Sequence, residues 1–247
     1  MPSHRYLSMR ELGAKRLFDL IVVSLAAVCW LPVLCLCGAL ILFFDGAPVF
    51  YKSQRRTGAG TNTVWKFRTM VKNAADLCNR GNTRIEREVR FLNIDSSSPL
   101  YTGVGRLIER ATLTEIPQLF HVLTGKMTLV GNRPLPEDVV AALSKAYSNV
   151  EARFLTPAGL TGPAQLAGRD SLTDRQRLRL EAIYCTVASQ DLVWRLDFMI
   201  LLYTVLTSLH LKAPMSYDNV QEFMLNLSRP GTTHAEIEEL PRSSSEG

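Results

Sequence analysis

Lys66 and Arg68 are two cationic residues separated by one position in the segment WKFRTM. On an extended strand, side chains two positions apart project from the same side, so these two cations would lie together. With Arg55 and Arg56 they could hold a diphosphate, because arginine offers a two-pronged donor and lysine a compact point charge. The other interpretation is a basic patch beside a membrane, in contact with anionic lipid headgroups.

Arg133 lies in the segment GNRP, between Gly131 and Pro134. Glycine permits backbone dihedral angles that other residues avoid, and proline stiffens the chain, so this loop should hold the arginine in a fixed position. A fixed arginine suits phosphate recognition. The alternative is an arginine that bonds neighbouring carbonyl oxygens and supports the loop.

Thr114 and Glu115 form a third group, in the segment TLTEIP. Thr112 and Glu115 have the spacing of a capping box, but a helix starting there would place Pro117 where a backbone hydrogen bond is lost. A start at Thr114 puts Pro117 in the first turn, so the sequence predicts Thr114 as the N-cap. The free N–H groups of a helix start attract anions, and Glu115 beside them could bind a divalent cation or act as a base.

An uncharged run of 25 residues, 20–44, precedes all of these groups. Its length suffices for a helix that crosses a bilayer. Pro32 near its middle removes a helix hydrogen bond, and basic residues flank both ends, which favours the cytoplasmic side for each end. We therefore predict a re-entrant helix-break-helix with halves 20–31 and 33–44, each too short to span the membrane. A single spanning helix is the alternative.

The remaining pattern predicts a mostly helical α/β domain. It indicates a hairpin, or an extended segment leading into a helix, at 49–70. It also indicates helices at 105–124 with a break near Thr112, at 137–154 and at 172–211, and a loop with short extended pieces at 156–168. The apolar part of the last helix, 198–209, is too short to span a membrane and is expected to lie in the interface or to pack on the re-entrant helix.

Charge and composition narrow the class of partner. The net charge is +5, and residues 1–72 hold ten Lys and Arg against three acidic residues, so the positive charge is concentrated around the apolar run. A basic excess suggests an anionic partner. Nucleic acid is not expected, because the long uncharged run and the lack of basic residues interleaved with aromatics are unlike nucleic-acid binders. The five cysteines form no C-x-x-C pair and indicate buried thiols in a reducing compartment.

Taken together and in order, seven segments resemble the bacterial sugar transferase family, the monotopic phosphoglycosyl transferases. The segments are KRLFDL at 15–20, the apolar run with Pro32, APVFYKSQRRTG at 47–58, WKFRTM at 65–70, VGRLIER at 104–110, TEIPQLFHVLTGKMTLVGNRP at 114–134 and RFLTPAGLTGPAQLAGRD at 153–170. A match spread over this much of the chain is specific, whereas any one segment alone would be weak.

The resemblance implies a function as well as a fold. It implies a small cytoplasmic domain on a re-entrant membrane helix, at the cytoplasmic face of the bacterial inner membrane. There the family transfers a sugar 1-phosphate from a UDP-sugar to polyprenyl (undecaprenyl) phosphate, with UMP released and Mg²⁺ required. This step initiates exopolysaccharide or glycoconjugate synthesis, and other polysaccharide-assembly enzymes are possible partners. The corresponding divisions are 1–14 as an N-terminal cytoplasmic segment, 15–46 as the membrane helix, 47–211 as the transferase domain and 212–247 as a C-terminal extension with a disordered tail.

The resemblance also assigns candidate site residues. In the family an Asp-Glu pair begins a helix, and the Asp carries the sugar-phosphate covalently; Thr114 stands at the Asp position and Glu115 at the Glu position. Thr114 and Glu115 are therefore the catalytic candidates, and Glu115 is the metal candidate. At Glu109 the family usually has Arg. The substrate-binding candidates are Lys66, Arg68, Arg110 and Arg133, with Gly159, Thr161 and Gln165 shaping the nucleotide loop.

Two interpretations of the chemistry remain open. The first is an active transferase that uses Thr114 or Glu115, or in which the lipid phosphate attacks directly. A threonine hydroxyl is neutral and needs a nearby base, and Glu115 would lie about 100° round a helix from Thr114. The second is a catalytically weak relative that binds substrate or partner enzymes and modulates an active paralogue.

Overall fold

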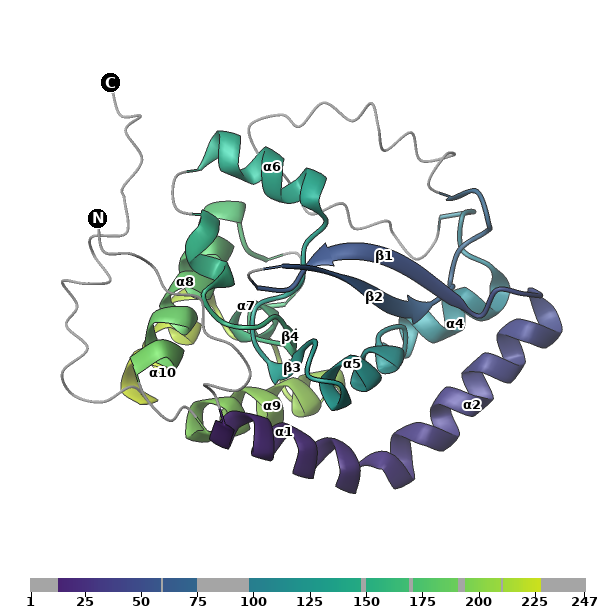
Figure 1. Cartoon of the computed structure of the whole chain (residues 1–247), viewed down its shortest axis with the longest axis horizontal. Coiled ribbons are helices and arrows are strands. Elements are labelled where there is room, and N and C mark those ends of the chain that lie inside the picture. Colours follow the sequence, from purple (N-terminus) through teal and green to yellow (C-terminus); the bar gives the residue numbers. More distant parts are fainter. Residues whose placement is uncertain are drawn as a thin grey trace.

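The computed structural model describes residues 13–58, 60–74, 98–147, 150–168, 171–190, 194–209 and 211–227. The elements, shown in Figure 1, follow in this order: α1 Gly13–Leu25, α2 Ala27–Phe44, β1 Phe50–Arg56, β2 Thr61–Phe67, α4 Gly103–Arg110, η1 Ile116–Gln118, α5 Leu119–Leu123, β3 Thr128–Val130, α6 Glu137–Ala146, η2 Val150–Phe154, β4 Gly159–Thr161, α7 Pro163–Leu166, α8 Asp174–Gln190, α9 Trp194–Ser208 and α10 Tyr217–Leu227. The described part is mostly helical with two small sheets, as predicted. The predictions for residues 1–12 and for the tail 228–247 lie outside the described residues.

The apolar N-terminal run forms two helices, α1 and α2, that meet at a bend (Figure 1). The predicted break at Pro32 is wrong, because Pro32 lies inside α2 and the bend lies at Ala26. A helical proline lacks an N–H and crowds the carbonyl four residues before it, so the distortion falls in the turns that precede it. The Trp30 indole donates a hydrogen bond to the Val23 carbonyl at 3.0 Å. In a straight helix the amide of Ala27 would donate to this carbonyl instead.

Among the helices of the described residues, α2 is the one with the length and composition of a membrane-crossing helix. Its 18 residues have a mean hydropathy of 2.5, and 17% of them are buried against the protein. Large apolar side chains are exposed along both helices, and Leu25 and Val28 beside the bend are 75% and 81% exposed. The predicted equal halves are therefore replaced by a shorter helix of 13 residues and a longer one of 18.

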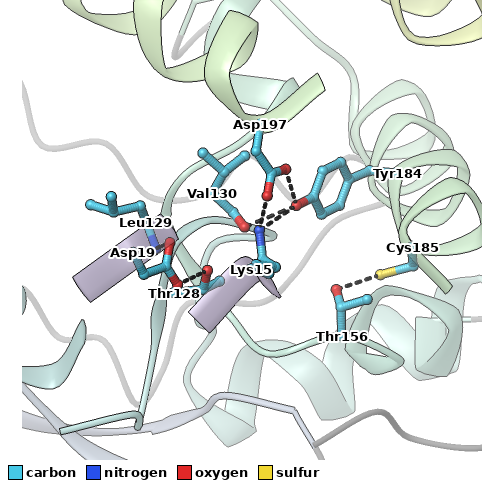
Figure 2. Close-up of polar contacts among 9 residues, drawn as sticks. All are labelled: Lys15, Asp19, Thr128, Leu129, Val130, Thr156, Tyr184, Cys185 and Asp197. Atoms are coloured by element: carbon cyan, nitrogen blue, oxygen red, sulfur yellow. Dashed lines mark hydrogen bonds and ion pairs between the residues drawn. The ribbon is translucent and has the colours of Figure 1, made fainter. Parts of the chain in front are cut away.

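The helix pair α1 and α2 is called the apolar arm below. Polar residues of α1 attach this arm to the rest of the domain (Figure 2). The Lys15 ammonium forms a buried ion pair with Asp197 of α9 and donates to the Tyr184 hydroxyl at 3.1 Å. One turn later, Asp19 accepts from the Thr128 hydroxyl at 2.6 Å. The spacing of four residues puts both groups on one helix face, so α1 is bound to β3, α8 and α9 through this face.

β1 and β2 form the predicted antiparallel hairpin, in which Tyr51 pairs with Lys66 and Phe50 with Phe67. Phe67 is fully buried and packs in a small core with Ile41 of α2 and Ile108 of α4. The other end of the hairpin is joined to the loop after β3 by a bridge between Arg56 and Leu135.

β3 and β4 form a two-stranded parallel sheet at the centre of the domain. Two glycines permit the close approach of their ends, since a Cβ on Gly159 would lie 2.0 Å from the Gly131 nitrogen and one on Gly162 would lie 2.1 Å from the Gly131 oxygen. This contact brings the GNRP loop next to the segment predicted to shape the nucleotide site.

Among the C-terminal helices, α9 contacts both strands of this sheet and lies beside α1, and α10 packs against α8 and α9 (Figure 1). The expected helix at 172–211 is two helices, α8 and α9, and the expected helix at 137–154 ends at Ala146, where Tyr147 takes an extended backbone. α9 packs on α1, which is one of the two arrangements expected for its apolar part, and Phe198, Leu202 and Val205 remain partly exposed. The main hydrophobic core of the described residues includes side chains of β3, α8 and α9. α10 packs on this core through Val220 and Met224, both fully buried.

Candidate active site

A polar pocket opens between the hairpin, the 3₁₀ turn η1, the loop that follows β3 and the start of β4. Its lining combines three cations with one carboxylate and a few apolar groups: Ser53, Arg55, Val64, Lys66, Glu115, Gln118, Arg133, Pro134, Gly159 and Leu160. The structure therefore brings together Lys66, Glu115, Arg133 and Gly159 of the predicted site.

Lys66 lies on β2, and its environment makes it an unusual cation. Burial, followed by the nearby Arg55 guanidinium, lowers its pKa to about 8, and Arg133 acts in the same direction. The carboxylates of Glu115 and Glu109 oppose this fall in pKa. An anionic ligand would relieve the mutual repulsion of the three cations, so the pocket is suited to a group with at least one negative charge.

Arg133 and Glu115 form an ion pair at the pocket wall. The two guanidinium nitrogens each reach one carboxylate oxygen, Nη1 to Oε2 at 3.3 Å and Nη2 to Oε1 at a shorter distance. Arg55 lies nearby and donates to the Pro134 carbonyl at 3.2 Å and to the Ser53 hydroxyl at 2.9 Å. Two arginines with fixed orientation suit the recognition of phosphate oxygens.

Arg153 supports the Arg133 loop from behind and was not predicted as a site residue. It is 1% exposed, forms an ion pair with Glu181 at 2.6 Å and donates to the Arg133 carbonyl at 3.0 Å. Asn132 adds a second tie, since its amide donates to the Arg153 carbonyl at 2.8 Å. The one available signal in the sequence was a charged residue at the start of the largely apolar segment RFLTPAGL.

The prediction that Thr114 caps a helix is wrong. The first helical turn after it is η1, in which Glu115 occupies the N-cap position and no side chain caps the turn. The helix that follows, α5, has only five residues. The Thr114 hydroxyl instead donates to Glu109 Oε2 at 2.8 Å. Pro117 does lie in the first turn, as expected. The tertiary contact with α4 is thus preferred to the local cap.

The turn that brings Glu109 and Thr114 together follows α4. Thr112 N donates to the Glu109 carbonyl at 3.0 Å and Leu113 N to the Ile108 carbonyl at 3.0 Å, which is the Schellman pattern of a helix end. Thr112 occupies the left-handed position of this pattern with φ 58°. Glycine is the usual residue there, and a β-branched residue is rare.

Four other candidates lie outside the set of residues that lines the pocket. The buried Arg68 donates to the carbonyls of Pro48 at 2.6 Å, Asp45 at 3.1 Å and Gly46, so it bonds the turn between α2 and β1. Arg110 is exposed at the end of α4. The buried Thr161 hydroxyl contacts Thr204 of α9 at 2.8 Å. Gln165 lies in the short helix α7, behind β4.

A comparison with known families places this site in context. The model of a family described as bacterial sugar transferase matches residues 10–211. The chain belongs to this family. The matched range contains α1, α2 and every residue that lines the pocket, so the apolar arm and the pocket are parts of one sugar transferase unit.

Individual relatives agree with this membership. The chain is similar to the exopolysaccharide production protein ExoY of Rhizobium meliloti, with 32% identity over 185 residues that cover 72% of the chain and 80% of the relative. It is also similar to the undecaprenyl-phosphate galactose phosphotransferase of Salmonella typhimurium, at 32% identity over 69% of the chain and 36% of the relative. The undecaprenyl-phosphate glucose phosphotransferase of Komagataeibacter xylinus is 34% identical over 72% of the chain and 34% of that protein.

Proposed function

We propose that this chain transfers a sugar 1-phosphate from a UDP-sugar to undecaprenyl phosphate at the cytoplasmic face of the bacterial inner membrane, as a step in exopolysaccharide synthesis. The observation that carries the proposal is the pocket that places Arg55, Lys66 and Arg133 around one space. Three cations at one pocket suit a diphosphate, because phosphoryl transfer depends mostly on positioning and on stabilising negative charge.

The apolar arm supports the choice of a lipid acceptor. α1 and α2 expose large apolar side chains, and α9 beside α1 adds others, so the pocket belongs to a domain with an apolar face. A polyprenyl chain would partition into a bilayer and present its phosphate at the bilayer surface, close to such a domain.

The packing of the arm supports the re-entrant arrangement. The N-terminal part of α1 binds the domain through Lys15 and Asp19, and the C-terminal part of α2 packs on it through Cys37 and Ile41. Both ends of the arm therefore contact one domain, while apolar side chains are exposed along the length of the arm, including Leu25 and Val28 at the bend. A helix pair of this kind enters and leaves a bilayer on the same side.

Mg²⁺ would fit the pocket as an ion that both the protein and the UDP-sugar coordinate. Glu115 lines the pocket together with Lys66 and Arg133. Within the described ranges, no three His, Cys, Asp or Glu side chains gather as a metal cluster. To hold the ion, the Glu115 carboxylate would exchange its ion pair with Arg133 for the metal, and phosphate oxygens of the donor would supply further ligands, an arrangement that Mg²⁺ commonly adopts. When bound, it would neutralise part of the diphosphate charge.

UMP release by the purified full chain in phospholipid nanodiscs tests this function. We expect UMP from UDP-glucose or UDP-galactose, with sustained release only when undecaprenyl phosphate is present. The double variant Lys66→Ala/Arg133→Ala should lose this release and still melt as a folded protein. The function is refuted if wild-type protein with either donor, or with their N-acetylated forms, binds no donor and yields no UMP.

A second candidate function is that of a relative that binds the donor without turnover. The observation that favours it is the burial of Thr114, which is 6% exposed and already hydrogen bonded. Donor binding by calorimetry, combined with the absence of UMP with or without lipid, would select this candidate instead.

A further inference from the structure

Gln118 is a buried polar residue of the pocket wall whose side chain has no partner in the fold. It lines the pocket from the 3₁₀ turn η1 and is 6% exposed. Its backbone amide donates to the Glu115 carbonyl at 2.9 Å, but among the described residues no group is hydrogen bonded to its side-chain amide. Buried polar groups are in the great majority hydrogen bonded, so an exception at a pocket wall points to a group that binds a ligand.

The buried polar side chains that flank Gln118 along the chain do have partners. The Thr114 hydroxyl donates to Glu109 at 2.8 Å. His121 Nε2 accepts a hydrogen bond from the backbone amide of Trp65 at 3.0 Å. The fold therefore satisfies its own polar groups on both sides of Gln118 and leaves the Gln118 amide available to the pocket.

The chemistry of the Gln118 amide differs from that of the cations in the same pocket. Arg55, Lys66 and Arg133 are charged donors and suit phosphate oxygens, which only accept. A carboxamide carries no charge and offers two N–H donors together with an acceptor oxygen. A sugar hydroxyl also donates and accepts, so it is the complement of this amide. The pocket thus combines charged donors for a diphosphate with a neutral amide for an uncharged part of the donor substrate.

The position of Gln118 indicates which part of a UDP-sugar it meets. Side chains three positions apart eclipse in a 3₁₀ turn, so Gln118 lies beside Glu115, which is paired with Arg133. The amide is therefore a neighbour of the groups proposed to hold the diphosphate. In a UDP-sugar, the hydrogen-bonding substituent nearest to the diphosphate is the one on carbon 2 of the sugar, because carbon 1 carries the phosphate. The ribose hydroxyls are separated from the diphosphate by the 5′ carbon, and the uracil lies beyond the ribose.

We propose that Gln118 binds the polar substituent on carbon 2 of the transferred sugar and so contributes to the choice of donor; the inference rests on the proposed transferase function. A hydroxyl or an acetamido group at carbon 2 both donates and accepts, and either one pairs with the amide. A donor that lacks this substituent leaves the amide buried without a partner, which lowers the affinity for that donor. UDP without a sugar makes no contact with Gln118.

Calorimetric titration of the full chain in nanodiscs tests this contact. The first ligand is the donor that wild type binds most tightly among UDP-glucose, UDP-galactose and their N-acetylated forms. The other two ligands are the 2-deoxy analogue of that donor, and UDP. The proteins are wild type, Gln118→Met, which keeps the length of the side chain and removes the amide, and the control Gln54→Met, at an exposed glutamine of β1. Melting temperature reports on the folding of each variant.

Wild type and Gln54→Met should bind the complete donor about tenfold more tightly than its 2-deoxy analogue, the effect of one hydrogen bond. Gln118→Met should bind donor and analogue with equal affinity, at the level of the analogue, and should bind UDP as wild type does.

Three results would overturn the inference and leave the transferase function standing. In the first, Gln118→Met loses UDP affinity by the same factor as donor affinity, which would place the amide at the uridine. In the second, Gln118→Met still prefers the donor to its analogue about tenfold. In the third, wild type binds donor and analogue equally, a result that decides the matter even if Gln118→Met does not fold. Absence of binding of all four donors to wild type would remove the function and the inference together.

Discussion

The Arg133 guanidinium contacts both carboxylate oxygens of Glu115 at the wall of the pocket. This pair lets the pocket hold an arginine in a fixed position before any anion arrives. We predict that Arg133→Ala weakens UDP-sugar binding about tenfold or more, because a charge-assisted hydrogen bond contributes roughly 1.5–3 kcal/mol. Calorimetric titration measures this, with Arg179→Ala, an exposed arginine of α8, as the matched control for lost charge. Equal affinity in the two variants would leave Arg133 a structural residue only.

The lowered pKa of Lys66, about 8, predicts a pH dependence of binding. The ammonium is the form that attracts phosphate, and it is lost as the pH rises through the pKa. UDP-sugar affinity should therefore fall about tenfold between about pH 7 and about pH 9, and a bound anion should shift the midpoint upward.

Lys66→Arg provides the control for this prediction, since arginine stays charged throughout that range and any titration of the uracil ring affects both proteins equally. Affinities of both proteins at several pH values give the comparison. Parallel profiles in wild type and Lys66→Arg would show that Lys66 does not control the titration.

The left-handed backbone of Thr112 predicts a stabilising substitution. Thr112 has φ 58° and an exposed side chain, so Thr112→Gly should raise the free energy of unfolding by about 1 kcal/mol through relief of backbone strain. Thr112→Ala keeps a Cβ and should gain less than about 0.5 kcal/mol. Denaturant unfolding in detergent compares the three proteins. A destabilised glycine variant would mean that the threonine side chain contributes more than its backbone costs.

The buried pair of Lys15 and Asp197 predicts strong non-additivity (Figure 2). Lys15→Met leaves the Asp197 carboxylate buried beside the Tyr184 hydroxyl, at 2.8 Å, and should cost roughly 3–5 kcal/mol. The double variant Lys15→Met/Asp197→Leu removes both charges and should recover much of that loss. Unfolding free energies of the single and double variants form the cycle. A double variant with the summed loss of both singles would show that the pair is not coupled.

The sequence predicted the elements whose signals are local, and it failed where tertiary contacts decide. The hairpin around Lys66 and the apolar arm follow from alternation and from a long uncharged run. The bend lies at Ala26 and not at Pro32, because a proline distorts the turns before it and the Trp30 indole binds a carbonyl freed at the bend.

The candidate site was predicted in part for the same reason. Lys66, Glu115 and Arg133 meet at the pocket as their motifs suggested. The cap assigned to Thr114 was wrong because a longer-range partner, Glu109, takes its hydroxyl. Arg153 could not be assigned from sequence, since its role depends on packing behind a loop twenty positions away. Arg68 resembled a ligand by spacing, and only the structure shows that it bonds the turn at 45–48.

The central claim is that this chain moves a sugar together with one phosphate onto a lipid phosphate. The most direct measurement uses UDP-glucose or UDP-galactose carrying radioactive phosphorus only at the position next to the sugar, with the full chain and undecaprenyl phosphate in nanodiscs. Our account predicts that the label enters the lipid fraction and that the released UMP is unlabelled. Label released as UDP, or retained in the aqueous fraction while the sugar enters the lipid, would contradict it.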